Sequence, residues 1–300
     1  MSGPTPTVGL QMLFQRKRDD GVQKIYKHWS KSNNCEMKFS IYIPDSARPS
    51  EKFHAIMFLP GAYCNEQDFL NRTNFHEHAS EFKFVVVCPD TGPKVEVAGD
   101  KDSQWLGQTA SWYIDAVTEP WSKHYQMHSY VAKELPELVV KHFPVLPKFG
   151  ICGHSMGGAG AAVIGLRNTD RFQSISLFAP NCNPISWGAD CVFTPLLGAE
   201  NKDTLWILND PTEVAKRYDG PFRNILVDQG TEDEYYKRTK TLNPERLVAA
   251  AEANPKGAKV IKVNLRMHQG LGHSFDFVEK FWRSHFQHHS QQLELSSLFN

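Results

Sequence analysis

The 300-residue sequence has no charge of one sign in excess and no long hydrophobic run. Lysine and arginine together number 33, and aspartate and glutamate also number 33. Proteins that bind nucleic acids, or membrane surfaces through polybasic segments, need a strong positive excess. The longest apolar runs, such as residues 84–88, have the length of a strand and not the roughly 20 residues of a membrane-spanning helix. We therefore expect neither nucleic acid nor membrane as a partner.

Cysteine pairs and targeting signals are also missing. The six cysteines are scattered, and no two of them form a CxxC motif. Residues 1–10 show no basic segment followed by an apolar stretch, and residues 297–300 match no retention or peroxisomal tag. Free thiols and the absence of a secretory signal favour a reducing compartment, so we expect a cytoplasmic protein without disulfides.

Domain boundaries have no signature in this chain either. There is no internal repeat, no low-complexity tract and no linker rich in Pro, Gly or Ser. With 41% hydrophobic residues, the chain can bury a sizeable core. We predict a single domain over residues 1–300, with residues 1–20 and 290–300 as peripheral tails.

Short apolar runs alternate with segments of helical periodicity along the chain. The expected strands are 39–43, 55–59, 84–88, 149–152, 174–178, 224–227 and 260–265. The expected helices are 130–143, 156–166, 243–253 and 275–282. Buried strands separated by helices predict an α/β fold whose central sheet is mostly parallel and covered by helices on both faces. In such sheets the chemistry gathers at the carboxyl ends of the strands.

The pentapeptide Gly153-His154-Ser155-Met156-Gly157 is a G-x-S-x-G motif. It follows an apolar strand and precedes a helix-forming stretch, which is the context of a nucleophile elbow. The two glycines remove the Cβ atoms that would clash in such a sharp turn. The motif predicts Ser155 as a nucleophile and the Met156 N–H as an oxyanion donor.

A serine nucleophile needs a base and an acid that orients it. Two histidines follow the last expected strand, and we favour His273 over His268 because it lies in a Gly-rich loop. Three acids follow the 224–227 strand, namely Asp228, Glu232 and Asp233. Spacing favours Asp233 only slightly over Asp228 and leaves the choice open.

A second oxyanion donor is expected from the loop after an earlier strand. Pro60-Gly61-Ala62 follows the 55–59 strand, and we predict the Ala62 N–H as that donor. The alternative is an ordinary Pro-Gly turn.

The remaining candidates predict no cofactor and no metal. Phosphate-binding and dinucleotide-binding motifs are missing. His285, His288 and His289 crowd the last helix, but no acid or cysteine pattern accompanies them, so we expect them on a solvated face. Four tryptophans in loop-like contexts could wall a pocket, although packing is the more common role: Trp105, Trp112, Trp121 and Trp187.

With these residues placed, the sequence resembles the S-formylglutathione hydrolase (esterase D) family of α/β hydrolases from about residue 24 to residue 289. The stretches that carry the resemblance are 35–39, 64–69, 89–91, 113–116, 119–121, 153–158, 178–184, 228–230 and 272–274. Members usually read Leu-Ser-Gly-Leu-Thr-Cys where this chain has residues 59–64, so Pro60, Ala62 and Tyr63 depart from the pattern. Members also carry Tyr-Asp where Leu271 and Gly272 stand.

The resemblance implies an α/β-hydrolase fold and the roles of six residues. It places the nucleophile at Ser155, the acid at Asp233 and the base at His273. It also places the oxyanion donors at Ala62 and Met156, and a thiol beside the site at Cys64.

It further implies hydrolysis of S-formylglutathione to glutathione and formate, as in formaldehyde detoxification, without metal or cofactor, and it is compatible with a homodimer. Because of the departures, a broad short-chain carboxylesterase stays an alternative. An acyltransferase and a catalytically silent binding module on the same fold are more distant ones.

Overall fold

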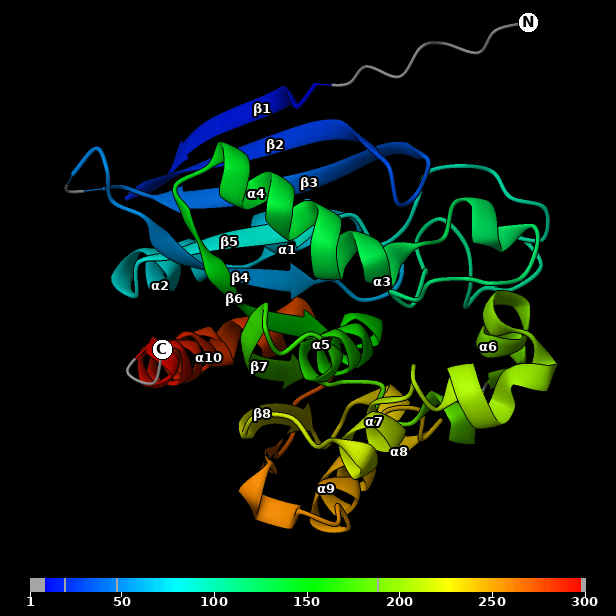
Figure 1. Cartoon of the computed structure of the whole chain (residues 1–300). Helices are drawn as coiled ribbons and strands as arrows, with labels where there is room; N and C mark the ends of the chain where they lie inside the picture. Colours follow the sequence, from blue (N-terminus) through cyan, green and yellow to red (C-terminus); the bar gives the residue numbers. More distant parts are fainter. Residues whose placement is uncertain (1–8, 19, 47, 188, 298–300) are drawn as a thin grey trace, which may run out of the picture.

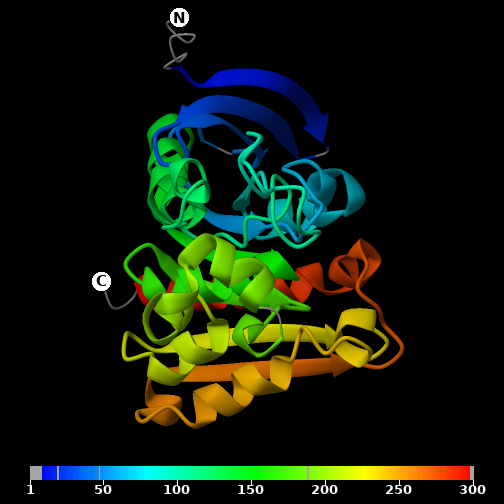
Figure 2. The same cartoon turned by 90° about the vertical axis from the view of Figure 1, so that its right-hand side faces the viewer.

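Nine strands form one sheet in the computed structural model, which describes residues 9–18, 20–46, 48–187 and 189–297 (Figure 1). The strands are β1 (Gln11–Arg18), β2 (Gly21–Ser30), β3 (Cys35–Pro44), β4 (Phe53–Leu59), β5 (Phe84–Pro89), β6 (Val145–His154), β7 (Phe172–Phe178), β8 (Arg223–Gly230) and β9 (Ile261–His268). Their order in the sheet is β1-β2-β3-β5-β4-β6-β7-β8-β9. Figure 2 shows this succession from blue β1 at the top to orange β9 at the bottom.

The sheet is parallel from β5 to β9 and antiparallel at its other end. The strands β5, β4, β6, β7, β8 and β9 pair in parallel, whereas β1, β2 and β3 form an antiparallel meander that joins β5. The expected α/β fold with a mostly parallel sheet is thus confirmed. Because parallel strands end at one edge, the loops after β4, β6, β8 and β9 gather there.

Alternation along β4 and β5 explains why both faces of the sheet are covered. In β4, Ala55 and Met57 belong to one hydrophobic cluster while Ile56 and Phe58 belong to the other. Successive side chains of a strand point to opposite faces, so an uninterrupted apolar run buries both.

Helices cover the two faces. The first face is covered by α4 (Leu135–His142), α5 (Met156–Arg167), α7 (Pro211–Arg217) and α9 (Pro244–Glu252). The second is covered by α1 (Asp68–Arg72), α2 (Phe75–Glu81) and α10 (Phe275–Ser297). The remaining short helices are α3 (Met127–Ser129), α6 (Ala189–Leu197) and α8 (Glu234–Lys237).

Helix α10 is longer than its expected range of 275–282. It continues to Ser297, and Leu293 is 1% exposed within the second cluster. In the part of the chain that the structure describes, no helix combines the length and the apolar character needed to cross a bilayer.

The expectation of a solvated face for the histidines of α10 is wrong. His285 and His289 are fully buried and His288 is 8% exposed. His289 is hydrogen-bonded through its two ring nitrogens to Ser174 and Ser176 of β7, at 2.6 and 2.8 Å. These histidines therefore form a polar layer between α10 and the sheet.

Candidate active site

Ser155 stands in a strained turn between β6 and α5. Its φ is +58° and its ψ is −120°, a conformation that residues other than glycine rarely adopt. A Cβ at Gly153 would lie 2.1 Å from the Gly157 carbonyl oxygen, and a Cβ at Gly157 would lie 1.9 Å from the Leu59 carbonyl oxygen. Both glycines of the motif are thus required by close backbone approach.

Backbone hydrogen bonds hold this turn in place. The Ser155 N–H donates to the Phe178 carbonyl at 3.0 Å, and the Ser155 carbonyl accepts from the N–H groups of Gly158, Ala159 and Asn181. The Ser155 hydroxyl donates to Asn181 Oδ1 at 3.4 Å, a long contact. The oxygen is therefore held only loosely.

The structure brings His273 and Asp233 together. His273 Nδ1 and Asp233 Oδ2 are 2.5 Å apart, and the Asp233 side chain is fully buried. Asp233 also caps α8, because its Oδ1 accepts from the N–H groups of Tyr235 and Tyr236. With Gln229 Nε2 at 3.2 Å from Oδ2, four donors hold this carboxylate. It is fixed in a position where it can orient the imidazole.

The alternative acid, Asp228, lies in a different network. Arg266 donates to it twice, at 2.6 and 2.5 Å, and His268 and His285 contact it at 3.1 and 3.0 Å. Burial alone would raise the pKa of Asp228, but the hydrogen bonds from His285, Arg266 and His268 hold it well below its usual range. His268, the less favoured base, is thus engaged with Asp228.

His154 packs beside His273, with ring centroids 4.5 Å apart. It is 6% exposed, and burial lowers its pKa well below the usual value, with the nearby His273 acting in the same direction. His154 is therefore neutral at neutral pH, and an imidazolium at His273 would not be repelled by a charge on His154.

The predicted oxyanion donors line one cavity with Ser155. Met156 is the first residue of α5, whose first amides have no acceptor within the helix. Ala62 lies in the loop after β4, where the Tyr63 N–H donates to the Thr109 carbonyl. Neither the Ala62 nor the Met156 N–H donates to another backbone group of the described residues. Gly61 brings this loop close, since a Cβ there would lie 3.2 Å from Ser155 Cβ.

The cavity has a volume of about 200 Å³ and largely aromatic walls. Three of the four tryptophans singled out in the sequence line it, namely Trp105, Trp112 and Trp187, whereas Trp121 is buried in the core against Tyr125. The Trp112 indole N–H donates to the Trp105 carbonyl at 2.7 Å.

Cys64 lines the same cavity. Burial raises the pKa of this thiol to about 11, and the charge of Asp68 raises it further while that of Arg72 lowers it. The thiol is therefore protonated at neutral pH.

Sequence reasoning gave no role to several residues of the cavity, among them Arg72, Asn181 and Tyr235. Asn181 lies in one of the stretches that carry the family resemblance, but no residue pattern gives a role to it, to Arg72 or to Tyr235, so only the folded chain reveals them in the cavity. Within the described residues, no three His, Cys, Asp or Glu side chains are grouped so that they could hold a metal ion. The arrangement combines a loosely held hydroxyl, a paired imidazole and carboxylate, and two unengaged amides, which are the groups that acyl transfer to water requires.

Comparisons with known proteins agree on one family. The family model Esterase matches residues 30–293. The S-formylglutathione hydrolase of Bos taurus is 38% identical over 290 residues, which are 95% of this chain and 99% of that protein, and that of Mus musculus is 37% identical over the same shares. A solved S-formylglutathione hydrolase from Agrobacterium tumefaciens is 34% identical, covers 94% of this chain and 99% of its own, and superposes with a TM-score of 0.86. This chain therefore belongs to the S-formylglutathione hydrolase family of serine hydrolases.

Proposed function

We propose that this chain hydrolyses S-formylglutathione to glutathione and formate through an acyl-serine at Ser155. The observation that carries the proposal is the 2.5 Å contact of His273 with the buried Asp233, in the cavity where the strained Ser155 stands. Family membership over nearly the whole chain supports the substrate.

The first half-reaction forms the acyl-enzyme. The Ser155 hydroxyl leaves Asn181 and turns to His273, whose Nε2 takes the proton as Oγ attacks the thioester carbonyl carbon. The Ala62 and Met156 N–H groups bind the resulting oxyanion, and one such donor is worth about 10²–10³ in rate. The carbon–sulfur bond then breaks, and the thiol leaves with the proton from His273.

The second half-reaction releases the acid. His273 takes a proton from water, whose oxygen attacks the formyl carbon, and the Ser155 oxygen leaves with that proton. Formic acid departs and gives its remaining proton to the solvent to become formate. Asp233 keeps the Nδ1 proton of His273 in place, so that Nε2 is the nitrogen that exchanges protons. Neutral His154 leaves the imidazolium of each transition state undisturbed.

Replacing Ser155 by alanine tests the nucleophile. Without the hydroxyl no acyl-enzyme can form, so Ser155→Ala should lower kcat by about 10⁶ while the far-UV circular dichroism spectrum stays that of the wild type. Activity near the wild-type value in this variant would reject the mechanism.

A broad short-chain carboxylesterase is the second candidate, and the aromatic cavity walls favour it because they offer packing to an aryl leaving group. The ratio of kcat/KM on S-formylglutathione to that on 4-nitrophenyl acetate separates the two. We expect the thioester to be the better substrate, and a clearly higher value for the aryl ester would favour the carboxylesterase.

We also propose a cytoplasmic homodimer. All six cysteines are free, as expected of a reducing compartment, and cell fractionation of the tagged chain tests that location. The edge strand β1 exposes Met12, Leu13 and Phe14 at 50, 44 and 44%, and such an apolar edge is suited to contact a second copy.

A further inference from the structure

One side chain gives the active-site cavity its permanent charge. Among the described residues that line the cavity, Arg72 alone is permanently charged. Apart from the two histidines the other lining residues are uncharged, and His154 is held neutral by burial. A ligand that enters the cavity therefore meets a single fixed positive charge.

An aromatic ring positions this charge beside the loop that carries His273. Arg72 ends α1, and its guanidinium carbon lies 4.5 Å from the centroid of the Phe275 ring. Phe275 follows His273 by two residues and begins α10. A guanidinium stacked on a ring keeps its N–H edges available for hydrogen bonds in its own plane.

No acid in the described part of the chain neutralises Arg72. It forms no ion pair or hydrogen bond with another described side chain, whereas Lys17 and Arg283 each pair with an acid. Asp68 lies one turn earlier on α1, but its Oδ2 accepts from the Asn65 N–H at 2.9 Å. The guanidinium is also exposed, so binding an anion there does not require breaking an internal contact.

We infer that Arg72 forms a carboxylate subsite at the mouth of the cavity and binds a carboxylate on the thiol portion of the substrate. The inference rests on the proposed function, since the glutathione portion of S-formylglutathione carries two carboxylates. A guanidinium binds a carboxylate through two parallel N–H···O bonds, which fixes the orientation of the ligand as well as its position. Arg72 thus selects for anionic thiols without touching the reacting atoms.

The test measures binding of S-methylglutathione and of its diethyl ester, each as an inhibitor of 4-nitrophenyl acetate hydrolysis. The readout is the ratio of the two inhibition constants in each protein, so a general loss of activity or of folding cancels. A charge-assisted hydrogen bond is worth about 1.5–3 kcal/mol, or roughly 10–100-fold in affinity. In Arg72→Gln we expect the acid to lose about tenfold or more of its affinity relative to the ester.

Two further variants sharpen the result. Arg72→Lys keeps the positive charge but loses the two parallel N–H donors of the guanidinium. Its ratio of inhibition constants should therefore fall between those of the wild type and Arg72→Gln. Arg283 is the matched control, because its guanidinium also lies over a ring, 5.7 Å from the centroid of Phe82, but outside the cavity. Arg283→Gln should leave the ratio at the wild-type value.

An unchanged ratio in Arg72→Gln would overturn the subsite, as would equal shifts in Arg72→Gln and Arg283→Gln. It would also be overturned if S-methylglutathione and its ester inhibited the wild type equally. Failure of the wild type to hydrolyse S-formylglutathione would count against the proposed function alone, because the inhibition ratio is measured on a different ester.

Discussion

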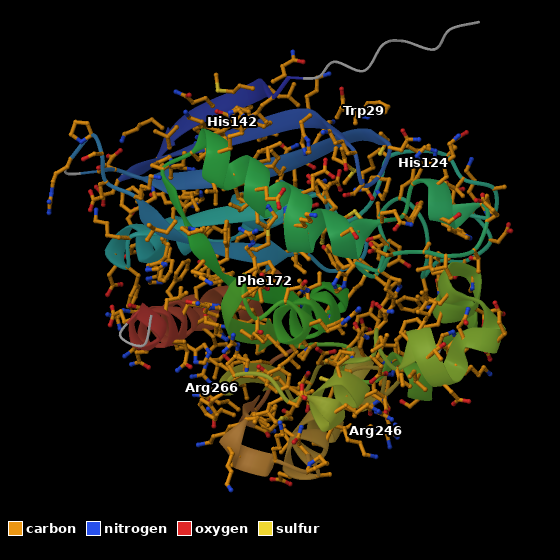
Figure 3. The ribbon with its side chains drawn as sticks, viewed as in Figure 1. Trp29, His124, His142, Phe172, Arg246 and Arg266 are labelled. Atoms are coloured by element: carbon orange, nitrogen blue, oxygen red, sulfur yellow. The ribbon has the colours of Figure 1, made fainter. Side chains whose placement is uncertain are left out.

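Two aspartates five residues apart on one segment have different surroundings. Asp233 binds the imidazole of His273 and the first amides of α8. Asp228 binds Arg266, whose side chain is labelled beside β8 in Figure 3, together with His268 and His285. Asp228 therefore ties β8 to β9 and α10, while Asp233 faces the cavity residue His273.

Exchange of each acid for its amide should separate these roles. Asp233→Asn should lower kcat by about 10³–10⁴, because the amide cannot hold the required tautomer of His273. Asp228→Asn should lower the free energy of unfolding by roughly 3–5 kcal/mol, because it breaks a buried charge network, with a smaller effect on kcat. Kinetics and urea unfolding on both variants check this. A larger loss of kcat in Asp228→Asn would mean that Asp228 is the orienting acid.

The sequence identifies a functional residue when the signal is local. Ser155 is recognisable because the glycines of its turn are needed within two residues of it. The choice between Asp228 and Asp233 depends on partners about 40 residues later in the chain, which spacing cannot reveal. Arg72 has no local pattern that links it to Ser155, and Asn181 meets Ser155 only through hydrogen bonds formed in the folded chain.

At the scale of the element, α10 joins the sheet through buried histidines. His288 is hydrogen-bonded to the Ile175 carbonyl at 3.0 Å. Burial lowers the pKa of His288 to about 4, with the charges of His285 and Arg266 acting in the same direction. Because an exposed histidine titrates near pH 6.5, the unfolded chain binds a proton between pH 6.5 and 4 that the folded chain does not. The stability that neutral His288 contributes is present above pH 6.5 and lost as the pH falls toward 4.

His288→Gln should therefore flatten the dependence of stability on pH. Between pH 7 and pH 5 the wild type should lose roughly 2 kcal/mol more unfolding free energy than the variant. Buried Asp90 and Asp210, whose pKa values are raised to about 6, contribute the opposite slope, but they do so equally in both proteins. Urea unfolding at the two pH values measures the difference. The control is His142→Gln, at an exposed histidine that ends α4 and is labelled in Figure 3, and its stability should depend on pH as that of the wild type does. If the stability of His288→Gln depended on pH as strongly as that of the wild type, His288 would not be the source of this pH dependence.

At the scale of the element, the expected strands match β3 to β9 and miss only β1 and β2. The uninterrupted apolar runs of β4 and β5 identify them as strands in the sequence, because both of their faces lie in a hydrophobic cluster. Strand β2 alternates buried and half-buried positions with polar residues among them, and β1 is mostly exposed with only three consecutive apolar residues, so neither has an apolar run of strand length. The histidines of α10 were misjudged because their partners, the serines of β7, lie more than 110 residues away.

At the scale of the whole molecule, the two hydrophobic clusters share their strands. Residues 55 and 57 pack into one cluster and residues 56 and 58 into the other, so neither cluster can open without disturbing β4. The antiparallel strands β1 to β3 continue the same sheet through the pairing of β3 with β5. We propose on this ground that the described chain is one cooperative domain.

Unfolding should then be a single transition in every probe. Trp282 reports on one cluster and Trp112, Trp121 and Trp206 on the other, so tryptophan fluorescence and far-UV circular dichroism should give coincident urea curves.

Because a dimer gains stability by mass action, the midpoint of urea unfolding should also rise with protein concentration if β1 joins two copies. Phe14→Lys on β1 should abolish that rise, whereas Phe222→Lys, at an equally exposed site 48% accessible outside β1, should keep it. Separated fluorescence and dichroism transitions would divide the chain into domains, and a midpoint independent of concentration in the wild type would reject the homodimer while leaving the single domain intact.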